Sequence, residues 1–242
     1  MLVMYLNNYL SKNGCFFKFV RIMLFMKNIA IVFFCFLLLA CSESSTEPEV
    51  FDASRVCPEN KRGTFVDDRD GQVYKYTTIG NQVWMAENLN YKMESGSYDA
   101  YSSSCSSVED NCDGRGLSYS YDVVLEACPK GWHLPEQKEW DKLIEKMGGA
   151  EIAGERLKAV DGWHPLNRDD PLGGTDDCGF SLKSAVSSNW DGEGYSAELW
   201  SATKAPHSYR TLVTIYFYSN KSWVHNLQGI DRDNFSIRCI KD

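Results

Sequence analysis

The chain lacks the short motifs that mark several common enzyme classes. It has no G-x-S-x-G nucleophile turn, no H-E-x-x-H zinc-protease motif and no phosphate-binding Walker loop. It also has no C-x-x-C pair, and its four histidines stand singly along the sequence. Because structural metal sites usually draw on clustered Cys and His ligands, the sequence predicts no metal site and no cofactor. These absences argue against P-loop nucleotide hydrolases and against hydrolases built on either of the other two motifs.

An apolar run long enough to span a membrane is missing too. Residues 29–40 are apolar throughout, but a spanning helix needs roughly 18–20 such residues. Basic Lys27 precedes the run, and Leu38-Leu39-Ala40-Cys41 ends it. This order of charge, apolar core, small residue and cysteine is that of a lipoprotein export signal, and it resembles the lipobox, whose cysteine is acylated after cleavage. We predict a signal peptide over residues 1–40, with an ordinary secretory signal or a membrane-spanning N-terminus as alternatives.

Cys41 is then the lipid-anchored first residue of the exported protein, and the signal starts at Met23 or Met26. Residues 42–49 are polar and acidic without apolar spacing, as in a flexible linker. They also resemble the acidic tract that some surface lipoproteins carry. We therefore predict a lipidated tether over 41–56 and a location at the bacterial outer membrane or cell surface. Two or more acyl chains suffice for stable anchoring, since each buried methylene contributes roughly 0.8 kcal/mol.

The exported part is acidic and large enough for one domain, predicted over 57–242. Four of the 25 basic residues and none of the 33 acidic residues precede Cys41, so the exported net charge is about −12. Such a charge argues against nucleic acid or an anionic membrane surface as a partner. The lipid is then the protein's sole predicted contact with the membrane.

Cysteine is the residue that most constrains the exported domain. Two of the nine cysteines lie in the signal region and one is Cys41, which leaves six in the domain. An even number in an exported protein favours disulfides, but six cysteines allow 15 sets of pairs. The six are Cys57, Cys105, Cys112, Cys128, Cys178 and Cys239.

Hydrophobic periodicity predicts an α+β domain. Alternating residues over 72–79 and 83–86, joined by Gly80-Asn81, predict a β-hairpin. The clearest helix covers 135–149, where Trp140, Leu143, Ile144 and Met147 form one apolar stripe and Gly148 ends it. The remaining elements are a short helix over 120–127, a helix over 152–160, long loops over 92–118 and 161–194, and strands over 200–203, 212–218, 222–226 and 235–240.

Three segments carry a resemblance to a known family. They are Ile79-Gly80-Asn81-Gln82-Val83-Trp84-Met85-Ala86-Glu87-Asn88-Leu89-Asn90-Tyr91, Ala127-Cys128-Pro129-Lys130-Gly131-Trp132-His133-Leu134-Pro135 and Ser236-Ile237-Arg238-Cys239. Together with Asp70-Gly71-Gln72-Val73-Tyr74-Lys75 they closely resemble the Fibrobacter succinogenes major paralogous domain family, from about Thr64 to Asp242.

That family is similar to the C-type lectin-like fold, which also occurs in sulfatase-modifying-factor domains. The resemblance implies two helices packed on small antiparallel sheets, with long irregular loops and disulfides that fasten them. It also implies that Cys128 pairs with Cys239, as a first-helix cysteine pairs with a last-strand cysteine in that fold. Two further pairs then remain: Cys105 with Cys112, which are close in sequence, and Cys57 with Cys178.

The resemblance implies a compartment and a fold more readily than a reaction. Our first hypothesis is a non-catalytic binding module for glycans or plant cell-wall polymers, because the chain's seven tryptophans and thirteen tyrosines offer stacking faces for sugar rings. Trp163, Trp190 and Tyr195 lie in the long loop, where lectin-like folds place ligands, although such rings can equally fill the core. The Glu-Pro-Asn, Gln-Pro-Asp and Trp-Asn-Asp calcium motifs of sugar-binding lectins are absent.

Two other hypotheses stay open. One is a protein-binding or structural component of the outer envelope, which the acidic surface neither favours nor opposes. The other is an enzyme related to formylglycine-generating proteins, which would need a pair of reactive cysteines. We do not expect an enzyme, because every cysteine of the exported domain has a plausible structural partner. His133 is expected to be a hydrogen-bonded core residue.

Overall fold

The computed structural model describes residues 50–99, 115–165, 173–185, 194–206, 211–222, 224–230 and 233–242. Residues 51–242 form one compact unit. The predicted signal peptide and Cys41 lie outside the described ranges, as do Cys105, Cys112 and Trp190. No helix within the described ranges is both long and apolar enough to cross a membrane.

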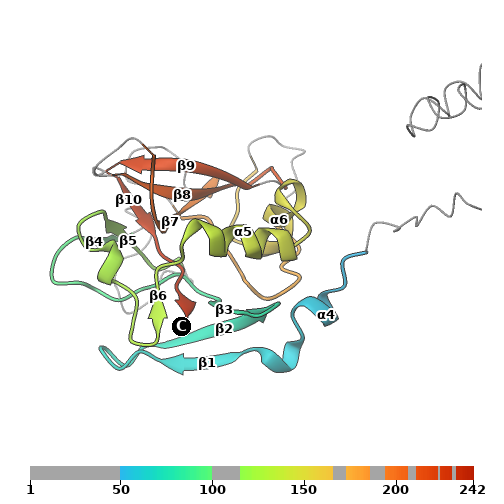
Figure 1. Ribbon diagram of the computed structural model, residues 1–242, viewed down its shortest axis with the longest axis horizontal. Coiled ribbons are helices and arrows are strands. Elements are labelled where there is room, and N and C mark those ends of the chain that lie inside the picture. Colours follow the sequence, from blue (N-terminus) through green and yellow to red (C-terminus); the bar gives the residue numbers. More distant parts are fainter. Residues whose placement is uncertain are drawn as a thin grey trace, which may run out of the picture. The chain divides into compact units, whose positions relative to one another are not determined.

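A five-stranded sheet forms one layer of the unit (Figure 1). Its strand order is β1-β2-β3-β11-β6, and all of its neighbouring strands are antiparallel. The predicted hairpin is confirmed, with Gly80 at positive φ in the turn between β2 and β3. The strands are β1 (Gly63–Val66), β2 (Val73–Ile79), β3 (Gln82–Met85), β6 (Trp132–His133) and β11 (Ile240–Lys241).

A six-stranded sheet forms the second layer, in the order β4-β5-β10-β7-β8-β9. Its neighbours are antiparallel except for β10 and β7, which run parallel. The strands are β4 (Ser97–Asp99), β5 (Leu117–Ser120), β7 (Ser196–Lys204), β8 (Thr211–Tyr218), β9 (Val224–Ile230) and β10 (Asn234–Ser236).

Two helices lie between the sheets (Figure 1). In α5 (Gln137–Lys146), a reciprocal pair of hydrogen bonds between Glu136 and Glu139 forms a capping box at the first turn. The helix ends at Lys146, Gly148 lies two residues beyond it at positive φ, and α6 (Ala150–Leu157) follows closely. The described ranges also contain three shorter helical turns: α4 (Ala53–Val56), η1 (Glu59–Lys61) and η3 (Val124–Glu126).

The main core joins both sheets to both helices. Trp140 of α5 packs against Trp84 of β3, with 4.7 Å between ring centroids, and both side chains are fully buried. Ile215 and Phe217 of β8 enter the same core from the other sheet. The predicted apolar stripe of α5 is therefore confirmed as a core surface.

Two disulfides join distant segments among the described residues. Cys57 is bonded to Cys178 and Cys128 to Cys239, with Cα atoms 5.4 and 6.0 Å apart. Both pairs are the predicted ones. The structure thus confirms an α+β unit with few helices, two small sheets and disulfides.

Several elements differ from the sequence predictions, and the predicted strand over 235–240 is divided into β10 and β11, which belong to different sheets. Phe51, Ala53 and Val56 pack against the core, and residues 53–56 form α4, so the folded unit starts before the end of the predicted tether. The predicted loop over 92–118 carries β4 and part of β5 at its two ends, because their backbones pair with each other. The predicted helix over 120–127 is reduced to the single turn η3.

Candidate functional site

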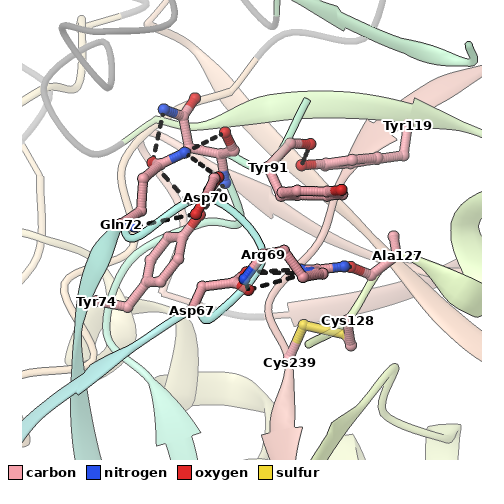
Figure 2. A network of polar contacts seen from close by, with 11 residues as sticks. Asp67, Arg69, Asp70, Gln72, Tyr74, Tyr91, Tyr119, Ala127, Cys128 and Cys239 are labelled. Carbon is pink, nitrogen blue, oxygen red and sulfur yellow. Dashed lines mark hydrogen bonds and ion pairs between the residues drawn. A yellow bond between two sulfur atoms is a disulfide. The ribbon is translucent and has the colours of Figure 1, made fainter. Parts of the chain in front are cut away.

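A network of polar contacts joins the turn after β1 to two distant segments (Figure 2). The guanidinium of Arg69 pairs with Asp67, with 2.7 Å between Nη2 and Oδ2, and donates from Nη1 to the Ala127 carbonyl at 2.7 Å. The central carbon of the guanidinium, Cζ, lies 3.7 Å from the ring centroid of Tyr91. Burial alone would lower the pKa of Arg69, but the hydrogen bond to Asp67 raises it. Arg69 therefore remains a cation that holds three segments together.

The same network continues through the side chain of Gln72. Its amide nitrogen donates to Asp70 at 2.7 Å and to the Asn90 carbonyl at 2.9 Å. Tyr74 accepts from the backbone N–H of Asn90, and Tyr119 donates to the Tyr91 carbonyl (Figure 2). These groups bond mainly to one another, so we interpret this region as a structural clasp.

Arg238 has a comparable structural role in the centre of the unit. It is fully buried, donates twice to Asn88 and once to the Phe180 carbonyl, and lies against the Phe180 ring. Burial lowers the pKa of Arg238 to about 9. Two segments that carry the family resemblance therefore meet through this contact.

His133 lies between two carboxylates, at the junction of β6 and α5. Nδ1 is 2.7 Å from Asp242 Oδ1, and Nε2 is 3.2 Å from Glu139. Because its side chain is 40% exposed, His133 is a partly exposed residue and not the predicted core residue. The carboxylates flank opposite nitrogens of the ring. They therefore suit a proton-dependent clamp better than a shared metal.

A different kind of surface lies on one face of β7 and β8. Val213, Ile215 and Phe217 of β8 are buried in the core. Alternate side chains of a strand point to opposite faces, so Thr214, Tyr216 and Tyr218 occupy the other face of β8. The rings of Tyr216 and Tyr218 are 4.4 Å apart, and the Tyr218 side chain is 36% exposed.

Glu198 of β7 lies directly beside this pair of rings. It stands opposite Tyr216 in the strand register and accepts a hydrogen bond from Thr214, with 2.6 Å between Oγ1 and Oε1. Burial, with a smaller contribution from the negative charge of Asp233, raises the pKa of Glu198 to about 7, although the hydrogen bond from Thr214 opposes the shift. Burial also raises the pKa of Tyr216 to about 12, so its hydroxyl stays protonated.

We name Glu198, Thr214, Tyr216, Tyr218 and the exposed His225 of β9 the tyrosine face. His225 stands opposite Tyr216 in the register. Thr214 is itself fully buried, and Glu198 is half-buried. The face therefore offers two aromatic rings and a partly exposed carboxyl, which together can bind a ligand that is apolar on one side and hydroxylated on the other. Among the described residues, no three His, Cys, Asp or Glu side chains are grouped to hold a metal ion.

The structure places the predicted ligand residues differently. Trp163 is 4% exposed and donates from its indole N–H to the Leu182 carbonyl at 3.0 Å, so it is a core residue. This corrects the expectation of an open stacking ring. The ring of Tyr195 is half-buried against His164, with ring centroids 5.7 Å apart. Trp190 lies outside the described residues.

The tyrosine face was not predicted from the sequence. The signal was present in residues 213–218, where buried Val, Ile and Phe alternate with Thr, Tyr and Tyr. Such alternation predicts a half-buried strand, and its two tyrosines are the positions that are not buried. Glu198 could not be assigned to the same face, because the pairing of β7 with β8 is not visible in the sequence.

Comparison with known proteins adds one finding. The sequence pattern of the family described as Fibrobacter succinogenes major domain matches residues 77–241. The match covers the segments that meet at Arg238 and includes β7, β8 and β9, the three strands of the tyrosine face. Searches of curated proteins and of solved structures found no match.

Proposed function

The chain belongs to the Fibrobacter succinogenes major domain family, and on that premise we propose that it is a non-catalytic, lipid-anchored surface protein that binds glycans on its tyrosine face. The ligand class is a polysaccharide of the kind found in plant cell walls. The observation that carries the proposal is the position of Glu198 and Thr214 beside the paired rings of Tyr216 and Tyr218.

The chemistry of a sugar ring suits this combination of side chains. A pyranose has C–H groups that pack on an aromatic ring and hydroxyls around its edge that need polar partners. The two tyrosine rings provide contact area at low entropic cost, since each side chain has few rotatable bonds. Glu198 provides a polar group next to them, and the buried Thr214 donates a hydrogen bond to its carboxyl.

The energetics of Glu198 also support a binding role. A carboxyl whose pKa is raised by burial is less stable in its ionised form than a solvated one. Residues kept at a cost to stability often serve function. A glutamine or leucine would fill this position without that cost.

The proposed placement at the outer membrane rests on the export signal and Cys41. The described unit starts at Phe51, and residues 42–50 connect it to the acylated cysteine. We also propose the C-type lectin-like architecture for the unit. In its support, Cys128 before the first long helix is bonded to Cys239 near the last strand, and the helices lie between small sheets.

The experiment is a pull-down of the chain from Ser42 to Asp242, secreted into an oxidising compartment, on insoluble cellulose and xylan. We expect retention that falls at least about tenfold in Tyr216→Ala and in Tyr218→Ala. Leu125→Ala is the matched control, since Leu125 is an exposed apolar residue on η3. Equal retention of all three variants, or no retention of the wild type, would contradict the proposal.

A further inference from the structure

The charge of the tyrosine face points to the class of glycan that it accepts. Glu198 lies at the middle of the face, between Thr214 on the neighbouring strand and the opposing Tyr216. Thr214 donates to Oε1 of this carboxyl. An ionised carboxylate has acceptor sites on both oxygens, so a ligand hydroxyl can donate to Oε2.

We infer that the tyrosine face binds uncharged saccharides and rejects acidic ones such as uronic acid chains; this inference rests on the proposed function. A sugar hydroxyl can donate to Oε2 and so satisfy the ionised Glu198. A ligand carboxylate has no proton to donate at neutral pH. It would leave Glu198 without that partner and add a like charge beside it.

Other negative charges near Glu198 also oppose the binding of acidic glycans. Asp233, which precedes β10, acts on Glu198 as a second negative charge. The exported chain has a net charge of about −12, which opposes the approach of a polyanion. Lys221 lies in the turn between β8 and β9, but its side chain is exposed to solvent, where salt screens its charge.

The preference for uncharged over acidic saccharides should depend on pH. The groups that face Glu198 are Thr214, Tyr216 and Asp233, with His225 opposite Tyr216. Because burial raises the pKa of Glu198 to about 7, the carboxyl is protonated at pH 5 and ionised at pH 8. At pH 5 Glu198 no longer carries the charge that repels a ligand carboxylate, so acidic sugars bind better there.

Isothermal titration with cellohexaose and with an oligogalacturonide of the same length tests the inference. For the wild type at pH 8 and low salt, we expect at least a tenfold preference for cellohexaose, equivalent to about 1.4 kcal/mol. The preference should shrink at pH 5. In Glu198→Gln we expect weaker cellohexaose binding, tighter oligogalacturonide binding and the same ratio at both pH values.

The outcomes separate the two proposals. If the oligogalacturonide binds as tightly as cellohexaose at pH 8, the inference is wrong, although the protein still binds glycans. If neither ligand binds and the pull-down on cellulose and xylan also fails, both the inference and the proposed function are wrong. A preference that is unchanged in Glu198→Gln would also contradict the inference, since it would place the selection elsewhere.

Discussion

Thr214 donates a hydrogen bond to Glu198 across β7 and β8, with 2.6 Å between Oγ1 and Oε1. Burial nevertheless raises the pKa of Glu198 from 4.5 to about 7. A carboxyl whose pKa is higher in the folded than in the unfolded state stabilises the fold below its unfolded pKa, and this contribution is lost as the pH rises through the folded pKa. The energetics of the tyrosine face should therefore be measurable without any ligand.

We expect Glu198→Gln to be more stable than the wild type at pH 8 by on the order of 2 kcal/mol. At pH 4 the difference should vanish, because the wild-type carboxyl is then protonated. Urea denaturation at the two pH values measures this. Thr214→Val is the companion variant, and its loss of the hydrogen bond should raise the pKa of Glu198 further. If the difference in stability between Glu198→Gln and the wild type is the same at pH 4 and pH 8, the raised pKa of Glu198 is contradicted.

His133 should titrate above its ordinary range. Burial alone would lower its pKa, but the hydrogen bonds to Asp242 and Glu139 raise it. The clamp therefore stabilises the fold fully below about pH 6.5, and this stabilisation is lost as the pH rises through the folded pKa. We expect Asp242→Asn to lower the His133 pKa in an NMR titration. A normal wild-type pKa, or one that Asp242→Asn leaves unchanged, would be inconsistent with the clamp.

Removal of the Cys128 to Cys239 disulfide should strongly destabilise the unit. The bond closes a loop with a sequence separation of 111 residues, and the entropy of closing such a loop corresponds to about 4–5 kcal/mol. We expect the Cys128→Ser, Cys239→Ser double variant to lose about that much unfolding free energy. Peptide mapping without reduction checks the pairing and tests the predicted Cys105 to Cys112 bond as well. A peptide that joins Cys128 to any other cysteine would overturn the connectivity.

The Arg69 and Asp67 pair should behave as a buried salt bridge. The Asp67 side chain is inaccessible to solvent, and the Arg69 side chain is 26% exposed. Removing one partner leaves a buried charge without compensation, so we expect Arg69→Met to cost about 3 kcal/mol. The exposed pair of Lys138 and Glu136 provides the control, and Lys138→Met should leave the unfolding free energy unchanged within error. Equal effects of the two substitutions would show that the clasp has no structural role.

The elements predicted correctly from the sequence are those with strong local signals. The hairpin has Gly80 in its turn, and α5 has an apolar stripe and a capping box, all of which depend on neighbouring residues. The two disulfides followed from the family resemblance instead. The short strands β1, β4, β5 and β6 were missed because long-range pairing stabilises them and their two to four residues carry no period.

The site was harder to predict than the fold. Trp163 is a large aromatic residue in a loop, and the sequence cannot show that Leu182 satisfies its indole N–H. The buried position of Arg238 is equally invisible, because it depends on the distant Asn88. Glu198 and Tyr216 become neighbours only through the register of β7 against β8. Local patterns thus identify faces of strands, whereas tertiary pairing decides which faces combine.

The most direct test of the account is an NMR titration of the Ser42 to Asp242 chain with cellohexaose at pH 8. We expect the largest changes in backbone amide chemical shift at Glu198, Thr214, Tyr216 and Tyr218, and we expect these changes to disappear in Tyr216→Ala. Glycan binding on the tyrosine face would be contradicted by shifts confined to the clasp around Arg69 and Tyr91, or by the absence of any shift at saturating sugar.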